Sequence, residues 1–285
     1  MMKKHFGDKM IISVELLFVG NELLNGKITN TNAQWLCEKI TKLGAQVNRI
    51  TTIPDDVEII ADTLRDIIAR KPDFIIISGG LGPTFDDMTL KGVEKALGEN
   101  YKLELNQEAL KMIEKQYELA AKLNIIKDGG LTEHRIKMAS IPRNSIPLYN
   151  PVGTAPGVLI KIPDNIVITC LPGVPQEMKA IFKRSISSLI RKKTEKSGIT
   201  FSKTEFIVKN RVESEIAPFV DKVMKEISGI WIKSHPKLKN GKAWVEVFIS
   251  SRDDINKSKQ KILEAKQKLI KLIEENGGII ELKEE

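Results

Sequence analysis

The sequence predicts an α/β protein with a largely parallel sheet, followed by a smaller α+β domain. Apolar runs rich in β-branched residues alternate with helical patterns from residue 11 to about residue 100, which is the rhythm of βαβ units. Turns rich in glycine and proline follow several of these runs. With 285 residues, the chain has room for about two domains.

The elements of the first domain, residues 1–190, follow from these patterns. We expect strands at 11–19, 45–53 and 73–80, with helices at 33–43 and 57–68 between them. The start imitates a signal peptide, but Glu15 interrupts its apolar run, so we interpret that run as a buried strand. A further helix follows Asp87, and the rest of the domain comprises a helix at 108–123, strands at 157–162 and 165–171, and a helix at 176–193.

The second domain is expected at residues 196–285. The stretch 191–203 mixes charge, glycine and serine without periodicity, so we interpret it as a linker. Beyond it the patterns predict strands at 204–210, 230–234, 244–250 and 277–282, and helices at 214–227 and 257–275. Trp231 and Trp244 fall in apolar strand runs, so we expect both in the core.

Composition narrows the class of protein. No apolar run approaches the roughly 18 residues of a membrane span. Cys37 and Cys170 sit inside apolar segments, which favours free thiols in a reducing, cytoplasmic compartment. The net charge of +8 lies entirely in the last part of the chain, because residues 1–170 hold 21 Lys+Arg and 21 Asp+Glu while residues 171–285 hold 24 and 16. Because Asp and Glu are interspersed with these basic residues, we favour a solvated lysine surface over an acidic partner.

The segment SGGLGPTFDDMT, residues 78–89, is the sharpest local feature. A buried strand ends in glycines just before a helix, where backbone N–H groups favour an anion, and Asp86 and Asp87 could hold a Mg²⁺ shared with phosphates. A tight turn with one aspartate capping the helix is the alternative. The spacing matches neither the P-loop nor the G-x-G-x-x-G pattern.

Polar groups also follow the first two strands. GNELLNGKITNTN, residues 20–32, supplies Glu22 and three successive hydrogen-bonding side chains at Asn30, Thr31 and Asn32, more than helix capping requires. Its glycine spacing and Ile28 exclude a P-loop. Asp55 and Asp56 follow the second strand, where capping explains one of them but not evidently both.

Two later segments, NPVGTAPG at 150–157 and CLPGVPQEM at 170–178, place glycine and proline beside strands. Such turns can form backbone cradles for a ligand, and they can equally be rigid turns with Pro175 in the first turn of a helix. Each is weak evidence when taken alone.

Together these five motifs resemble the N-terminal half of the CinA family, over residues 11–180. That domain is similar to the molybdopterin-binding domain of the MoaB, MogA and MoeA proteins, so the resemblance implies a three-layer α/β fold. CinA resemblance implies hydrolysis of ADP-ribose to AMP and ribose 5-phosphate with a divalent metal, Mg or Co. MogA resemblance implies adenylylation of molybdopterin instead, and a nucleotide- or pterin-binding protein without catalysis is the third possibility.

The resemblance also assigns residues. Asp87 and Asp55 match the aspartates that serve nucleotide and metal chemistry, so we expect them to be catalytic and, with Asp86, to hold the metal. None of the three histidines lies in these motifs, so a histidine-based metal site is not expected. The residues expected to bind substrate are Gly20, Glu22, Asn30, Thr31, Asn32, Gly79, Gly80, Gly82, Gly153, Thr154, Pro172 and Gly173.

The last 90 or so residues resemble the KH-like domain of CinA proteins, but they contain no GXXG loop. We therefore expect a structural or dimerisation element in a homo-oligomer, and no specific nucleic-acid binding. The two domains leave no chain for the nicotinamide-mononucleotide deamidase domain of full CinA proteins, so we expect no such activity.

Overall fold

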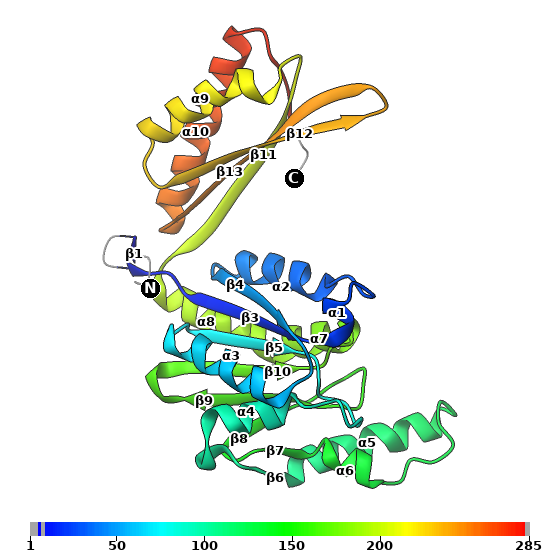
Figure 1. The fold of residues 1–285 in the computed structure, drawn as a ribbon. Coiled ribbons are helices and arrows are strands. Elements are labelled where there is room, and N and C mark those ends of the chain that lie inside the picture. Colours follow the sequence, from blue (N-terminus) through cyan, green and yellow to red (C-terminus); the bar gives the residue numbers. More distant parts are fainter. Residues whose placement is uncertain (1–4, 7–8, 283–285) are drawn as a thin grey trace. The chain divides into compact units, whose positions relative to one another are not determined.

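The computed structural model describes residues 5–6 and 9–282. Lys3 and Lys4, which precede the apolar run and belong to the signal-peptide-like pattern, lie outside these residues. The chain divides into two compact units (Figure 1). The first unit comprises mainly Ile12–Thr41 and Ala45–Lys193, and the second runs from Thr194 onward with a few short segments. Within the described part of the chain, none of the helices has the length and apolar character needed to cross a bilayer.

A six-stranded sheet organises the first unit, in the order β4-β3-β5-β10-β9-β8. The strands β3 (Ser13–Val19), β4 (Gln46–Ile53), β5 (Phe74–Ser78) and β10 (Ile166–Leu171) are parallel, whereas β9 (Gly157–Ile162) and β8 (Ser145–Leu148) pair antiparallel. The largely parallel α/β fold predicted from the alternating pattern is confirmed.

Helices cover both faces of this sheet (Figure 1). They are α2 (Thr31–Lys42), α3 (Val57–Ala69), α4 (Thr89–Leu97), α7 (Pro175–Ile181) and α8 (Ser187–Ser197). A single π-helical turn, Phe182–Ile186, joins α7 to α8. The strands β3 and β5 are buried throughout, as strands covered on both faces should be.

A small subassembly extends from this core. It contains β6 (Leu103–Leu105), α5 (Gln107–Lys122), α6 (Glu133–Lys137) and β7 (Ser140–Pro142), where β6 and β7 pair. The short helix α1 (Asn21–Leu24) is separate from it, because it follows β3 directly and contacts β4. The pattern predicted α5 but left most of the following segment irregular, because three- and four-residue strands are too short for a period to show.

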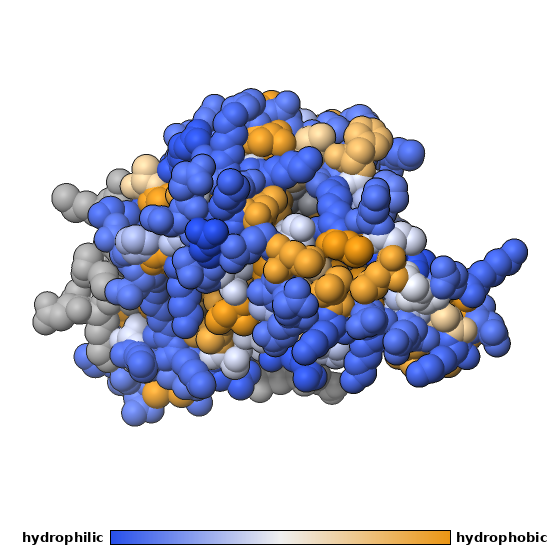
Figure 2. Space-filling view, turned by 90° about the horizontal axis from the view of Figure 1, so that it is seen from below, coloured by the Kyte–Doolittle hydropathy of each residue, from blue (hydrophilic) through white to orange (hydrophobic). Residues whose placement is uncertain are grey.

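The surface seen from below Figure 1 is mostly hydrophilic, and apolar side chains gather near its middle (Figure 2). Exposed apolar residues of the first unit include Leu119 on α5, Leu123 and Ile125 just after it, and Ile146 on the edge strand β8. Apolar patches on a protein surface often mark interfaces. The expected homo-oligomer stays a prediction.

The second unit has the connectivity β11-α9-β12-β13-α10-β14. Its strands are β11 (Thr200–Lys209), β12 (Ile230–Lys239), β13 (Lys242–Asp253) and β14 (Ile279–Leu282), and its helices are α9 (Glu213–Glu226) and α10 (Ile255–Glu275). All pairings are antiparallel, in the order β12-β13-β11-β14. This is the ferredoxin-like, or split βαβ, arrangement. The predicted α+β class is right. The KH-like character that the resemblance implies for this unit stays a prediction.

The division between the two units falls inside the predicted segment 191–203, but that segment is not an irregular linker. α8 continues through Ser197, and β11 begins at Thr200 after a turn in which Gly198 has a φ of 66°. The charged residues there lie on a helix with an exposed side, so the absence of an apolar period did not indicate a loop.

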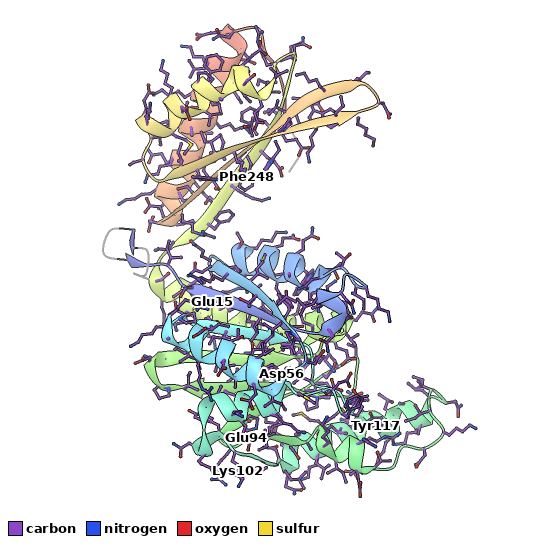
Figure 3. The ribbon with its side chains drawn as sticks, viewed as in Figure 1. Glu15, Asp56, Glu94, Lys102, Tyr117 and Phe248 are labelled. Carbon is purple, nitrogen blue, oxygen red and sulfur yellow. The ribbon has the colours of Figure 1, made fainter. Side chains whose placement is uncertain are left out.

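A buried ion pair joins the sheet to α3. Glu15, in the middle of β3, is 3% exposed, and its two carboxylate oxygens accept from Arg70 Nε at 2.9 Å and from an Arg70 terminal nitrogen at 2.6 Å. Figure 3 shows Glu15 within the sheet layer. Arg70 is the C-cap residue of α3, so the charge that interrupts the apolar run is neutralised by the helix end that follows β4.

We predict that Arg70→Ala destabilises the protein by about 3–5 kcal/mol, because it leaves the Glu15 carboxylate buried without a partner. Arg143→Ala is the matched control: its pair with Glu104 is half exposed on both sides, so its loss should cost about 0–1 kcal/mol. Urea unfolding of both variants measures the difference. Equal effects would show that the buried pair has no special role.

Candidate functional site

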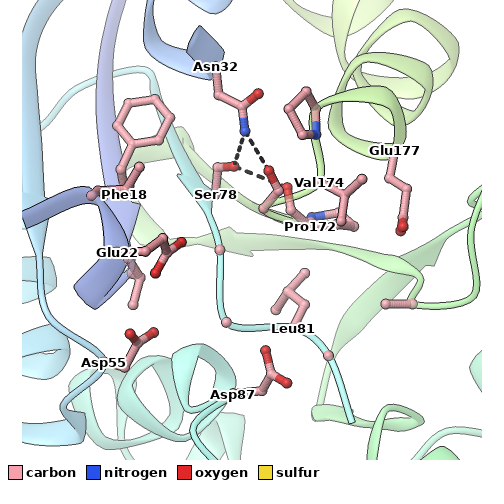
Figure 4. A pocket seen from close by; sticks show the side chains of 18 of the residues that line it. Phe18, Glu22, Asn32, Asp55, Ser78, Leu81, Asp87, Pro172, Val174 and Glu177 are labelled. Atoms are coloured by element: carbon pink, nitrogen blue, oxygen red, sulfur yellow. Dashed lines mark hydrogen bonds between the residues drawn. The ribbon is translucent and has the colours of Figure 1, made fainter. Parts of the chain in front are cut away.

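The carboxyl ends of the parallel strands surround one cavity of about 550 Å³ (Figure 4). β3 and β5 are neighbours, and the chain leaves them toward opposite sides of the sheet, which is the switch point where open α/β sheets bind ligands. The lining comes from the segments after β3, β4, β5 and β10, together with Thr154 and Ala155 before β9.

Most of the predicted site residues line this cavity. Of the predicted set, the lining contains Glu22, Asn30, Thr31, Asn32, Asp55, Gly79, Gly80, Gly82, Asp86, Asp87, Thr154, Pro172 and Gly173. Gly20 and Gly153 do not line it. The segments come together because the parallel strands all end at the same edge of the sheet.

Gly20, Gly82 and Gly153 each leave room for a carboxylate. A Cβ built at Gly20 would lie 2.6 Å from the Glu22 carboxylate, one at Gly82 2.5 Å from that of Asp87, and one at Gly153 2.2 Å from the Glu177 carboxyl carbon. Gly20 and Gly153 therefore lie outside the cavity lining, next to carboxylates that form part of it, and their predicted contact with a ligand stays a prediction.

Gly79 has a structural role that its sequence context did not reveal. Its φ is 116°, and a Cβ there would lie 2.0 Å from the carbonyl oxygen of Val19 at the end of β3. Its N–H donates to Leu171 O at 3.0 Å, so this N–H is not available to a phosphate, contrary to expectation. Gly80 follows with a φ of 63° and packs against Thr89.

The aspartates separate into distinct roles. Asp56 is the N-cap of α3, where one of its carboxylate oxygens accepts from the N–H groups of Glu58 and Ile59 (Figure 3). Asp55 instead lines the cavity and accepts from Asn21 N at 2.8 Å (Figure 4). The N-cap of α4 is Met88, without a side-chain cap bond. Neither Asp86 nor Asp87 therefore caps that helix, which disfavours the capping alternative.

Asp87 instead belongs to a short turn. One of its carboxylate oxygens accepts from Thr84 N at 2.8 Å and lies 2.6 Å from the Thr84 hydroxyl, which is also 2.5 Å from Asp86. The hydroxyl contact is the main cause that lowers the pKa of Asp86. Lys137, from α6, donates to the carbonyl oxygens of Thr84 and Asp87 and holds the turn from the other side.

On the opposite wall, Asn32 carries an unused acceptor. It is 7% exposed, and its amide nitrogen donates to Gly173 O at 2.8 Å and weakly to Ser78 Oγ at 3.4 Å. Its oxygen Oδ1 is buried and has no partner among the described residues. Asn30 Oδ1, by contrast, accepts from Ala33 N at the start of α2, so Asn30 serves as a cap.

Sequence reasoning missed Glu177 and Asn150. Glu177, in the first turn of α7, lines the cavity across from Glu22 and Asp55 (Figure 4). The Asn150 amide nitrogen donates to Glu177 at 2.6 Å and to Ala155 O, while its oxygen accepts from Val152 N and Gly153 N. Both lie in the two turn motifs described above, NPVGTAPG and CLPGVPQEM. The polar residues of these motifs, and not only their glycines, could therefore have indicated the site.

These contacts give Glu177 a distinct electrostatic setting. Burial raises the pKa of the Glu177 carboxyl above its ordinary value, and the Asn150 hydrogen bond offsets part of the rise. Because the folded state holds this proton more tightly than the unfolded chain, ionisation of Glu177 opposes folding. The penalty is absent at pH values below the ordinary carboxyl pKa and is complete above the raised pKa.

We therefore predict that Glu177→Gln changes the melting temperature more favourably at pH 7 than at pH 4, because the amide cannot ionise. The shift caused by the mutation should be up to about 2 °C more positive at pH 7. Glu114→Gln, an exposed site on α5, is the control and should shift both pH values alike. Scanning calorimetry at the two pH values checks this. A larger loss of stability at pH 7 than at pH 4 would contradict it.

Comparisons with known proteins agree with this architecture. A family model described as "Probable molybdopterin binding domain" matches residues 15–192. Relatives from Metallosphaera sedula and Sulfurisphaera tokodaii are 33% and 38% identical, over 95% and 93% of this chain and 98% and 97% of theirs. A crystal structure of CinA from Thermoplasma acidophilum, described as of unknown function, is 39% identical and covers 62% of this chain and 98% of its own, with a TM-score of 0.55. With more than half of its length matched by the family model, the chain belongs to the molybdopterin-binding domain family.

Proposed function

We propose that the first unit is a metal-assisted nucleotide pyrophosphatase that hydrolyses ADP-ribose or a related nucleoside diphosphate compound to AMP. The observation that carries this proposal is the charge of the cavity. Five carboxylates line it, namely Glu22, Asp55, Asp86, Asp87 and Glu177, and no lysine, arginine or histidine is among its lining residues in the described part of the chain. A phosphate can enter such a cavity only with a cation that offsets the repulsion.

The donor set fits a divalent cation of the Mg²⁺ type. No three histidine, cysteine, aspartate or glutamate side chains within residues 5–6 and 9–282 are grouped to hold a metal ion by themselves. Magnesium is commonly held by one or two carboxylates together with substrate phosphates and water, and does not need a complete protein cage. Asp55 and Asp87, with Asp86 beside them, are the residues that would hold it, and when bound it would polarise a phosphoryl oxygen.

The remaining steps fall to the chain's own groups. Hydrolysis forms a bond between a water oxygen and one phosphorus and breaks the bridging P–O bond, so each product carries one monophosphate. Of the two cavity aspartates Asp55 and Asp87, one would hold the cation, with Asp86 beside it, and the other takes the water proton. Thr154 and the backbone around Gly80 and Gly82 can donate to phosphoryl oxygens, and the buried Asn32 Oδ1 can accept an N–H of the ligand.

Molybdopterin binding, with or without adenylyl transfer, is the second candidate, and the family match favours it. A pterin ring carries N–H donors, and the carboxylate oxygens and the Asn32 amide oxygen of the cavity could accept their hydrogen bonds. Both candidates place a phosphate-bearing ligand in the same cavity.

The decisive experiment incubates the purified chain with ADP-ribose, and separately with ATP, in the presence of Mg²⁺ or Co²⁺. Chromatography then measures AMP. Formation of AMP from ADP-ribose supports the proposal. Saturable binding of a pterin without AMP supports the second candidate, and saturable nucleotide binding without product leaves a binding protein.

We predict that Asp87→Asn lowers AMP formation at least about 100-fold while the protein keeps its fold. The amide oxygen can still accept from Thr84, but the charge is lost. Circular dichroism and a melting curve verify the fold. A variant with wild-type turnover would remove Asp87 from the mechanism, and a loss that merely follows a lower melting temperature would assign it to the turn.

The pair Asp55→Asn and Asp56→Asn separates catalysis from capping with one chemical change at neighbouring residues. Asp55 faces the cavity, so its variant should lose at least about tenfold in turnover. Asp56 caps α3, a task that asparagine performs about as well, so its variant should keep both stability and turnover. Equal activities of the two variants would exclude a special role for Asp55.

A further inference from the structure

The sheet of the second unit has two chemically different faces. α9 and α10 pack on one face and bury alternate strand residues, among them Phe206, Val208, Val245, Val247 and Ile249. The residues between them point to the opposite side, which we call the open face. Figure 3 shows Phe248 on the side of the sheet away from the two helices. Trp231, on the edge strand β12, is 59% exposed there, so its predicted place in the core is wrong. Trp244, also predicted in the core, is half-buried and lies on the open face instead.

The open face carries more positive than negative charge. Its lysines are Lys203, Lys209, Lys233, Lys237, Lys239 and Lys242, and its glutamates are Glu205, Glu246 and Glu281. Each glutamate lies beside a lysine, in the pairs Lys203–Glu205, Lys237–Glu246 and Lys209–Glu281. Among the described residues, Lys233, Lys239 and Lys242 form no ion pair, so net positive charge is left at this surface.

Aromatic rings alternate with these lysines across β12 and β13. The register places Lys233 opposite Phe248 and Lys237 opposite Trp244. Lys203 Nζ lies 5.5 Å from the centre of the Phe248 ring. Trp231 lies diagonally from Phe248, roughly 7–8 Å away between backbones. Flat rings flanked by ammonium groups form a surface on which bases stack while phosphates contact the cations.

A cavity of about 710 Å³ lies at the hairpin end of this face. Lys209, Lys239 and Lys242 line it together with Asn210 and Trp244. The Trp244 indole nitrogen is buried and has no hydrogen-bond partner among the described residues. Glu281 also lines the cavity and pairs with Lys209. The ammonium groups of Lys239 and Lys242, which form no ion pair with the described residues, are therefore the ones that, beside an unused N–H donor, suit a phosphate group.

We propose that the open face binds single-stranded nucleic acid in a sequence-tolerant way, with bases stacked on Trp231 and Phe248 and phosphates held by the neighbouring lysines. Charge complementarity selects this occupant, because the same face of a second copy would set lysines against lysines. Exposed aromatics on a four-stranded antiparallel sheet are an established mode of single-strand binding that needs no GXXG clamp. The proposal concerns the second unit and is independent of the activity proposed for the first.

The test is fluorescence anisotropy of the whole chain with fluorescein-labelled 12-mers of oligo(U) and oligo(dT), at low and at physiological salt. We expect saturable binding at both salt concentrations, because stacking, unlike phosphate contact, is little affected by salt. Trp231→Ala should weaken binding about 5- to 150-fold, the range expected for loss of one stacked base. Trp231→Phe, which keeps a flat ring, should stay within about threefold of the native chain.

Charge variants separate this face from the general basic surface. Lys203→Ala/Lys233→Ala on the open face should reduce the slope of log affinity against log salt by about 0.7 for each phosphate that is no longer neutralised. Lys222→Ala/Lys225→Ala on the exposed side of α9 removes the same charge. This variant should leave the slope unchanged and keep the affinity within about twofold of the native chain. Melting curves confirm that each variant folds.

Three results would overturn the proposal. They are absence of binding at physiological salt, equal effects in the open-face and α9 variants, and unchanged affinity of Trp231→Ala. If oligonucleotides do not bind and sedimentation shows an oligomer that Trp231→Ala dissociates, the open face is an interface between copies. AMP formation by Trp231→Ala should equal that of the native chain, so failure of either proposal is visible separately.

Discussion

The close approach of Gly79 to the end of β3 is the constraint on which the candidate site depends. A side chain at this position would collide with the Val19 carbonyl, and the positive φ turns the chain sharply as it leaves β5. The Gly79 N–H also bonds to Leu171 at the end of β10, so one residue joins the ends of three neighbouring strands. The cavity opens immediately beyond this junction because the chain must diverge there toward α4.

The acidic wall of the cavity lies close to three glycines. A Cβ at Gly20, Gly82 or Gly153 would come within 3 Å of the carboxyl group of Glu22, Asp87 or Glu177, in that order. In the present conformation these glycines therefore leave space for the acidic side chains. The resulting concentration of negative charge explains why a phosphate ligand would have to bring a cation with it.

In the second unit, one alternating sequence pattern gives a single sheet two different faces. Val245, Val247 and Ile249 meet α9 and α10 and supply the core, while Trp244 and Phe248 between them belong to the open face. The strands of the first unit and those of the second unit therefore differ in how many of their faces are covered. Buried parallel strands such as β5 have no polar side, whereas these antiparallel strands do.

The sequence by itself determined the α/β class, most of the strands and helices, and the segments that meet at the cavity, because hydrophobic period and turn residues are local properties and parallel strands share one edge. The residue pattern alone did not distinguish the roles of Asp55 and Asp56, since either carboxylate can cap the following helix, and only the family resemblance singled out Asp55. Trp231 was wrongly expected in the core because a short apolar run does not say which face is covered. The partnership of Glu15 with Arg70, the use of the Gly79 N–H within the sheet and the place of Glu177 across the cavity were decided only by the tertiary structure. Each depends on a contact between residues that are far apart in the chain, and no local pattern encodes such a contact.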